Sequence, residues 1–77
     1  MELQRVIIIR RSMLGMSRKE LAEAAGISYP FLSGIETGDK DPSMGTLRSL
    51  ATALRFSSPG AMFQWAMALQ AFEEAHQ

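Results

Sequence analysis

The stretch from Ser17 to Gly38 constrains the fold most, because it holds two short helical patterns separated by a tight turn. Ser17 precedes the first pattern and Glu20 follows three residues later, a spacing at which the two residues cap each other's backbone amides. Ser28 precedes the second pattern as its own N-cap. Gly26 and Gly38 follow the two patterns at positions that suit a positive φ. The predicted helices cover residues 18–25 and 29–37.

Two helices joined by so short a turn form a helix-turn-helix, whose second helix enters the major groove of DNA. Apolar periodicity predicts three further helices, over residues 2–14, 44–55 and 59–75. The β-branched run Val6–Ile9 would also suit a strand. We favour a helix there, because the sequence offers no second run of this kind for a strand to pair with.

The last predicted helix is apolar almost all the way round, which is typical of a helix buried on more than one side. A domain this small covers only one of those sides, so we expect the other side to meet a second copy of the chain. The candidate dimer contacts are Met62, Trp65, Leu69 and Phe72. The chain is therefore predicted to be one domain over residues 1–77, with a four-helix core (1–56) and a dimerisation helix (57–77).

Composition narrows the function classes. The 77 residues are 47% hydrophobic and include no cysteine, so a disulfide framework or a thiolate metal site cannot form. One histidine and no glycine-rich phosphate loop argue against an enzyme, a metal site or a cofactor, and no small-molecule ligand is evident. No apolar run approaches the roughly 20 residues that cross a bilayer, so we expect no membrane partner, and the absence of cysteine favours a reducing cytoplasm.

The charge is balanced, with 8 Lys and Arg against 8 Asp and Glu, which is unusual for a protein that binds phosphates. The distribution is uneven, however. The first 19 residues carry five cations against Glu2 alone, so one basic face is possible. Such a face predicts modest non-specific affinity for DNA and makes binding as a dimer more necessary. Arg10 could equally be a solvated cation with no partner.

Several residues at fixed spacing resemble the Cro/phage-repressor (Xre-like) helix-turn-helix family over Ile9–Leu54. The matching residues are Arg11, Met16, Ser17, Glu20, Leu21, Ala22, Gly26, Ile27, Ser28, Leu32, Ser33, Ile35, Glu36, Gly38, Pro42, Ser43 and the segment Thr46–Ala51. The chain length and the long last helix are also similar to the small controller proteins of restriction–modification systems.

The resemblance implies an all-α, compact five-helix domain, lambda-repressor-like, that dimerises and binds double-stranded DNA at a palindromic operator. It implies an ion pair between Arg11 and Glu36 that ties the first helix to the third. It also implies DNA contacts from the second helix, the third helix and the following loop. These DNA-binding residues are Arg18, Lys19, Ser28, Tyr29, Pro30, Ser33, Gly34, Thr37 and Lys40.

The exposed side of the third helix departs from what direct base readout needs. It offers none of the Arg, Gln, Asn or Lys side chains whose donors and acceptors match base edges. The leading hypothesis is a homodimeric repressor or autoregulator of transcription that acts by operator occlusion, with specificity drawn partly from DNA shape. The alternative is a protein-interaction module of the same fold, either antitoxin-like or an accessory subunit.

Overall fold

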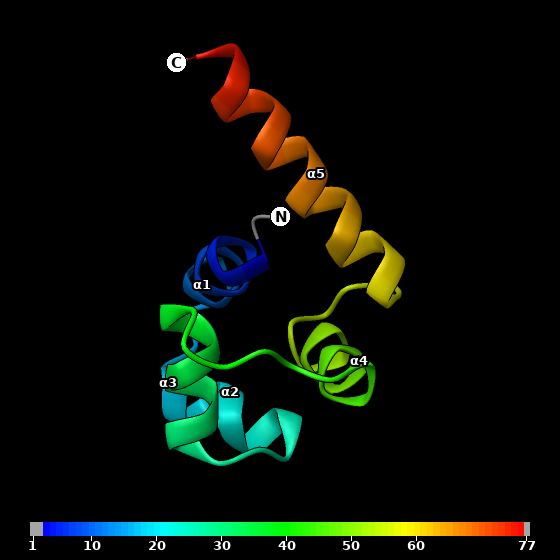
Figure 1. The fold of residues 1–77 in the computed structure, drawn as a ribbon. Helices are drawn as coiled ribbons and strands as arrows, with labels where there is room; N and C mark the ends of the chain where they lie inside the picture. Colours follow the sequence, from blue (N-terminus) through cyan, green and yellow to red (C-terminus); the bar gives the residue numbers. More distant parts are fainter. Residues whose placement is uncertain (1–2, 77) are drawn as a thin grey trace.

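The computed structural model describes residues 3–76, which form five helices (Figure 1). The helices are α1 (Leu3–Met13), α2 (Arg18–Ala25), α3 (Tyr29–Thr37), α4 (Met44–Ala53) and α5 (Pro59–Ala75). The described part of the chain contains no strand, so Val6–Ile9 lies in a helix as predicted. The predicted start at residue 2 and the predicted domain ends at residues 1 and 77 lie outside the described residues.

The caps read from the sequence form as predicted. The Ser17 hydroxyl accepts from the Glu20 amide at 3.0 Å, and the Glu20 carboxylate accepts from the Ser17 amide at the same distance. Ser28 caps α3, with its hydroxyl accepting from the Phe31 amide at 3.2 Å. Gly26 ends α2 at a φ of 70°. These contacts are local in sequence, which explains why α2 and α3 begin and end at the predicted residues.

Helix α4 ends two residues earlier than predicted because Arg55 adopts a left-handed φ of 61°. The Phe56 amide then donates back to the Ala51 carbonyl at 2.9 Å, which closes the helix end. Arg10 reaches across from α1 and donates to the Leu54 and Arg55 carbonyls, at 2.8 and 3.2 Å. A cation at this end of a helix also complements its dipole.

Arg10 is therefore not the solvated cation that the sequence allowed. Its guanidinium carbon lies 4.8 Å from the centre of the Phe56 ring and 5.2 Å from that of Trp65. The two rings meet edge to face, with centroids 5.3 Å apart. One side chain of α1 thus joins the end of α4 to the first half of α5.

The core is built mainly by the first four helices, with two contributions from α5. Its buried side chains are Val6, Ile7, Leu21, Ala22, Ala25, Leu32, Ile35, Leu47, Leu50, Ala51, Leu54, Met62 and Ala66. Met62 was predicted to contact a partner chain, but it is fully buried among the chain's own helices. That prediction was wrong because Met62 and Ala66, four residues apart, lie on the side of α5 that packs on the core.

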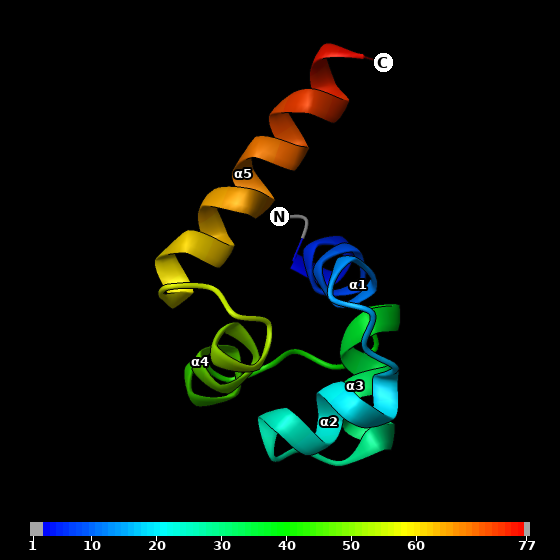
Figure 2. The same cartoon turned by 180° about the vertical axis from the view of Figure 1, so that it is seen from behind.

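The helices α2 and α3 lie at one end of the molecule, and the C-terminal half of α5 lies at the other (Figures 1 and 2). Helix α1 lies between them and contacts both α3 and α5. The C-terminal part of α5 extends beyond the other helices (Figures 1 and 2). An ion pair between Arg5 and Glu73 links this part of α5 to α1.

Candidate nucleic-acid interface

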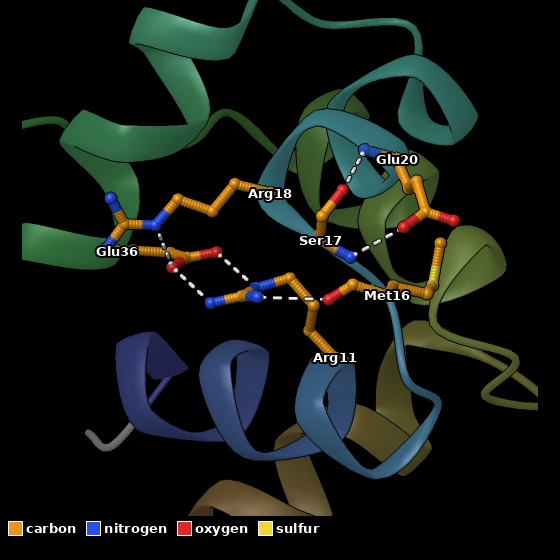
Figure 3. Close-up of polar contacts among 6 residues, drawn as sticks. All are labelled: Arg11, Met16, Ser17, Arg18, Glu20 and Glu36. Carbon is orange, nitrogen blue, oxygen red and sulfur yellow. Dashed lines mark hydrogen bonds and ion pairs between the residues drawn. The ribbon is translucent and has the colours of Figure 1, made fainter.

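A buried carboxylate holds the helix-turn-helix together. The Glu36 side chain is 0% exposed and lies between two arginines, as Figure 3 shows. Arg11 donates to its two oxygens from Nε and Nη2, at 3.0 and 3.1 Å, and Arg18 donates to Oε1 from Nε at 3.0 Å. The ion pair implied between Arg11 and Glu36 is present, and Arg18 is a second partner that the sequence did not indicate.

This network connects three helices. Arg11 lies on α1, Arg18 begins α2 and Glu36 lies near the end of α3. Arg11 also donates from Nη1 to the Met16 carbonyl at 3.0 Å, which fixes the link between α1 and α2. Charge-assisted and bidentate hydrogen bonds are geometrically specific, so the network ties α3 to α1 and α2 in this arrangement.

The Arg18 guanidinium group is hydrogen-bonded to Glu36, so only part of it is available to bind a DNA phosphate. Its hydrogen bond to Glu36 raises the pKa of Arg18, and interaction with the Tyr29 side chain raises that pKa further. The Arg18 side chain is still 39% exposed. It therefore stands at the start of α2 as a cation held next to the first residue of α3.

The N-terminal half of the α3 surface is open. Tyr29 is 48% exposed, and Pro30 beside it is exposed as well. Ser28 is exposed too, and its hydroxyl oxygen is occupied as the cap of α3. Lys19 is exposed on α2 and forms no ion pair with any of the residues described. These positions agree with the predicted accessible surface.

The C-terminal half of that surface differs from the prediction. The Ser33 hydroxyl was expected to face the groove, but its oxygen is buried and makes no hydrogen bond within residues 3–76. The Thr37 hydroxyl lies 3.2 Å from both the Gly34 carbonyl and the Asp39 carboxylate. The Ser33 hydroxyl is thus covered, whereas Thr37 remains exposed with its hydroxyl engaged by acceptors of its own helix and of the following loop, which sequence spacing does not reveal.

Gly34 was expected to offer close backbone approach, but Lys40 covers it. The Lys40 amide donates to the Gly34 carbonyl at 3.0 Å, and the lysine methylenes lie across the glycine. The signal for this contact was present in the sequence, since glycine inside a helix costs about 1 kcal/mol and usually marks a close approach. Together the groove-side residues line one shallow depression, formed by Tyr29, Pro30, Ser33, Gly34, Thr37, Asp39 and Lys40.

No group of three or more His, Asp or Glu side chains in the described part of the chain could hold a metal ion.

None of the five helices is long and apolar enough to cross a bilayer, as judged over the residues that the structure describes.

The chain belongs to the helix-turn-helix family, of the Cro/C1 (Xre) type, which matches residues 7–60. This is a family of DNA-binding transcriptional regulators and not of enzymes. The match covers α2, α3 and α4 completely and takes in most of α1. It confirms the family resemblance and the all-helical fold class that the sequence predicted.

Two relatives are regulators with longer chains. The chain is 41% identical over 49 residues to the HTH-type transcriptional regulator MT0491 of Mycobacterium tuberculosis (strain CDC 1551 / Oshkosh), covering 64% of this chain and 35% of the relative. It is 48% identical over 42 residues to the HTH-type transcriptional regulator DdrOP3 of Deinococcus deserti, covering 54% and 33%. The chain thus spans about a third of the length of the curated relatives it matches.

Two solved structures share the fold. A mutant of the restriction–modification controller protein C.Esp1396I superposes with a TM-score of 0.84 over 91% of this chain and 87% of that one, at 23% identity. The controller protein C.AhdI from Aeromonas hydrophila superposes with a TM-score of 0.74 over 79% and 91%, at 26% identity. The similarity to controller proteins, first suggested by size and the long last helix, is confirmed as a similarity of fold.

Proposed function

We propose that this chain is a transcriptional regulator that binds double-stranded DNA as a homodimer at a palindromic operator in the cytoplasm. It acts by occlusion, as a repressor or an autoregulator. The observation that carries the proposal is the Arg11–Glu36–Arg18 network, which holds α3 with an open outer face in a chain of a DNA-binding family. Two arginines on one carboxylate also leave a net positive charge beside α3.

The DNA contacts follow from this arrangement. Tyr29 and Pro30 at the start of α3 enter the major groove, and Arg18 and Lys19 at the start of α2 meet the backbone phosphates, assisted by Ser28. A tyrosine can donate one hydrogen bond or pack on a thymine methyl group, which reads few base pairs. DNA shape therefore supplies part of the specificity.

The dimer forms through α5. Trp65 is 37% exposed and Phe72 is 60% exposed, and these side chains lie seven residues apart on one side of the helix. Leu69, half-buried, lies at the edge of the same side. Pairing two copies through this surface covers apolar area that a monomer leaves in water. Two recognition helices then lie about 34 Å apart, on successive major grooves.

A titration tests the proposal. The protein is titrated into labelled duplex from upstream of its own gene and into random duplex of equal length, at several salt concentrations, with fluorescence anisotropy as the readout. We expect tighter binding to the upstream duplex, and affinity that falls with salt for both. Equal affinity for both duplexes at every salt concentration would contradict the proposal.

The protein-interaction module stays as a second candidate, because the Ser33 hydroxyl of α3 is buried and the Thr37 hydroxyl is hydrogen-bonded within the protein. Its DNA-independent function would survive Arg18→Ala and Lys40→Ala, and the protein would co-purify with one defined polypeptide. A regulator would instead bind its operator more weakly in both variants and retain its fold.

A further inference from the structure

Gly34 and Lys40 form a contact that depends on the absence of a side chain at position 34. A Cβ added at Gly34 would lie 2.4 Å from Lys40 Cγ, 3.3 Å from Lys40 Cβ and 3.7 Å from Lys40 Cδ. The first distance is far shorter than any non-bonded contact between two carbon atoms. The lysine stem therefore occupies the place on α3 where a side chain of residue 34 would begin.

The contact lies on the outer face of α3. Gly34 and Lys40 line the same depression as Tyr29, Pro30 and Thr37. The Lys40 amide is fixed by its 3.0 Å hydrogen bond to the Gly34 carbonyl, so the loop holds the lysine backbone against the helix end. Lys40 is exposed, and it forms no ion pair among the described residues.

The hydroxyl groups next to Lys40 on the α3 surface are either buried or hydrogen-bonded within the protein. The Ser33 hydroxyl is buried, and the Thr37 hydroxyl is within reach of the Gly34 carbonyl and the Asp39 carboxylate. The Asp39 carboxylate accepts from the Thr37 hydroxyl at 3.2 Å and forms no ion pair with Lys40. The long, charged donor on the C-terminal half of the α3 surface thus comes from the loop and not from the helix.

We propose that Lys40 is a base-reading residue, which supplies to the major groove the donor that α3 itself lacks. The inference rests on the proposed function of DNA binding. Its ammonium group contacts the edge of a base pair, and guanine, with O6 and N7 as acceptors, is the base that a lysine suits best. The Lys40 stem lies against the outer face of α3, which is the face that the proposed function places in the groove, and this directs the lysine toward the bases as well as the phosphates.

Binding of the full chain to its selected operator, to operators changed at single base pairs and to random duplex separates the two roles. If Lys40 reads a base, Lys40→Ala weakens operator binding by about 5- to 100-fold per half-site and abolishes discrimination at one base pair. Uniform weakening on all duplexes, with full discrimination kept and a salt slope reduced by about one, would overturn the inference.

Gly34→Ala provides a second test, because it pushes the lysine stem off the helix without removing its charge. We expect the same loss of discrimination with the helical fold kept, because the higher helix propensity of alanine offsets part of the cost of displacing the lysine stem. In the Lys40→Ala background, Gly34→Ala should change discrimination no further. Additive effects of the two substitutions would contradict the inference. Arg48→Ala, which removes an exposed cation from α4, is the control and should leave base preference unchanged.

The outcomes also separate this inference from the proposed function. A wild-type chain that prefers no duplex overturns both. A selective wild-type chain whose selectivity survives Lys40→Ala overturns only the role of Lys40.

Discussion

The two ends of the molecule are stabilised by different physics. The helix-turn-helix is fixed by a buried charge network, in which Glu36 receives three hydrogen bonds from Arg11 and Arg18. Helix α5 buries Met62 and Ala66 by apolar packing on one side, and its polar contacts, from Arg5 and Arg10, are made by side chains that are not fully buried. The charge network specifies one orientation of α3, whereas the apolar packing leaves half of α5 uncovered. We infer that the helix-turn-helix presents a rigid surface, whereas α5 presents an apolar surface that a partner chain can cover.

The largest expected effect comes from breaking the network. Glu36→Gln removes the buried carboxylate and leaves two guanidinium groups without their charged acceptor. We expect a loss of about 3–5 kcal/mol in the free energy of unfolding, measured by urea denaturation. Glu20→Gln, at an exposed cap in the same motif, is the control and should lose much less. A Glu36→Gln variant as stable as the wild type would show that the network does not set the fold.

Substitution on the open side of α5 should act on association instead. Phe72→Glu places a carboxylate in the proposed dimer surface and should raise the dimer dissociation constant at least about 30-fold, or about 2 kcal/mol. Multi-angle light scattering across a concentration series measures it. Met67→Glu is the matched control, because Met67 is 65% exposed and lies roughly opposite Phe72 around the helix. If Phe72→Glu dimerises as well as Met67→Glu, the assigned surface is wrong.

Arg10 joins α1 and the end of α4 to α5, so its removal tests how much a polar side chain contributes to holding α5. Arg10→Met loses the hydrogen bonds to the end of α4 and the contacts with Phe56 and Trp65. We expect about 2 kcal/mol of destabilisation in thermal unfolding, together with weaker dimerisation as α5 loosens. Arg48→Met, at an exposed position of α4, should change stability by less than about 0.5 kcal/mol. Equal effects would mean that Arg10 contributes only its charge.

The smallest expected effect is the change in stability at acidic pH that arises from Glu20. Hydrogen bonds from the Ser17 backbone and side chain lower the pKa of Glu20 from its ordinary value of 4.5. A lowered pKa means that the ionised form is favoured by folding, so its stabilisation is present above pH 4.5 and is lost as the pH falls below it. The melting temperature of Glu20→Gln should therefore fall less steeply than that of the wild type on acidification. Parallel curves would contradict the effect.

The sequence predicted the helix-turn-helix well because its signals are local. A capping residue acts on an amide three residues away, and Gly26 or Gly38 needs only its own φ to end a helix. These contacts form wherever the helix forms, and so spacing alone revealed them. The Arg11–Glu36 pair came from the family resemblance, since nothing in a spacing of 25 residues indicates contact.

What the sequence did not reveal depends on how helices rotate against one another. Met62 and Trp65 are both apolar residues of one helix, and only packing decides that the first is buried and the second half open. Ser33 is polar, yet packing buries its hydroxyl. Arg10 and Lys40 are long side chains whose partners lie on other elements. In each case the residue type was informative, but the direction of the side chain was set by the tertiary structure.

Selection of bound duplexes from a random pool tests the central claim most directly. If a dimer presents two copies of α3 to DNA, the selected sequences will contain an inverted repeat whose half-site centres are about 10 base pairs apart. A pool that stays random after repeated selection, or one enriched in single unpaired half-sites, would contradict a homodimer that recognises a palindromic operator.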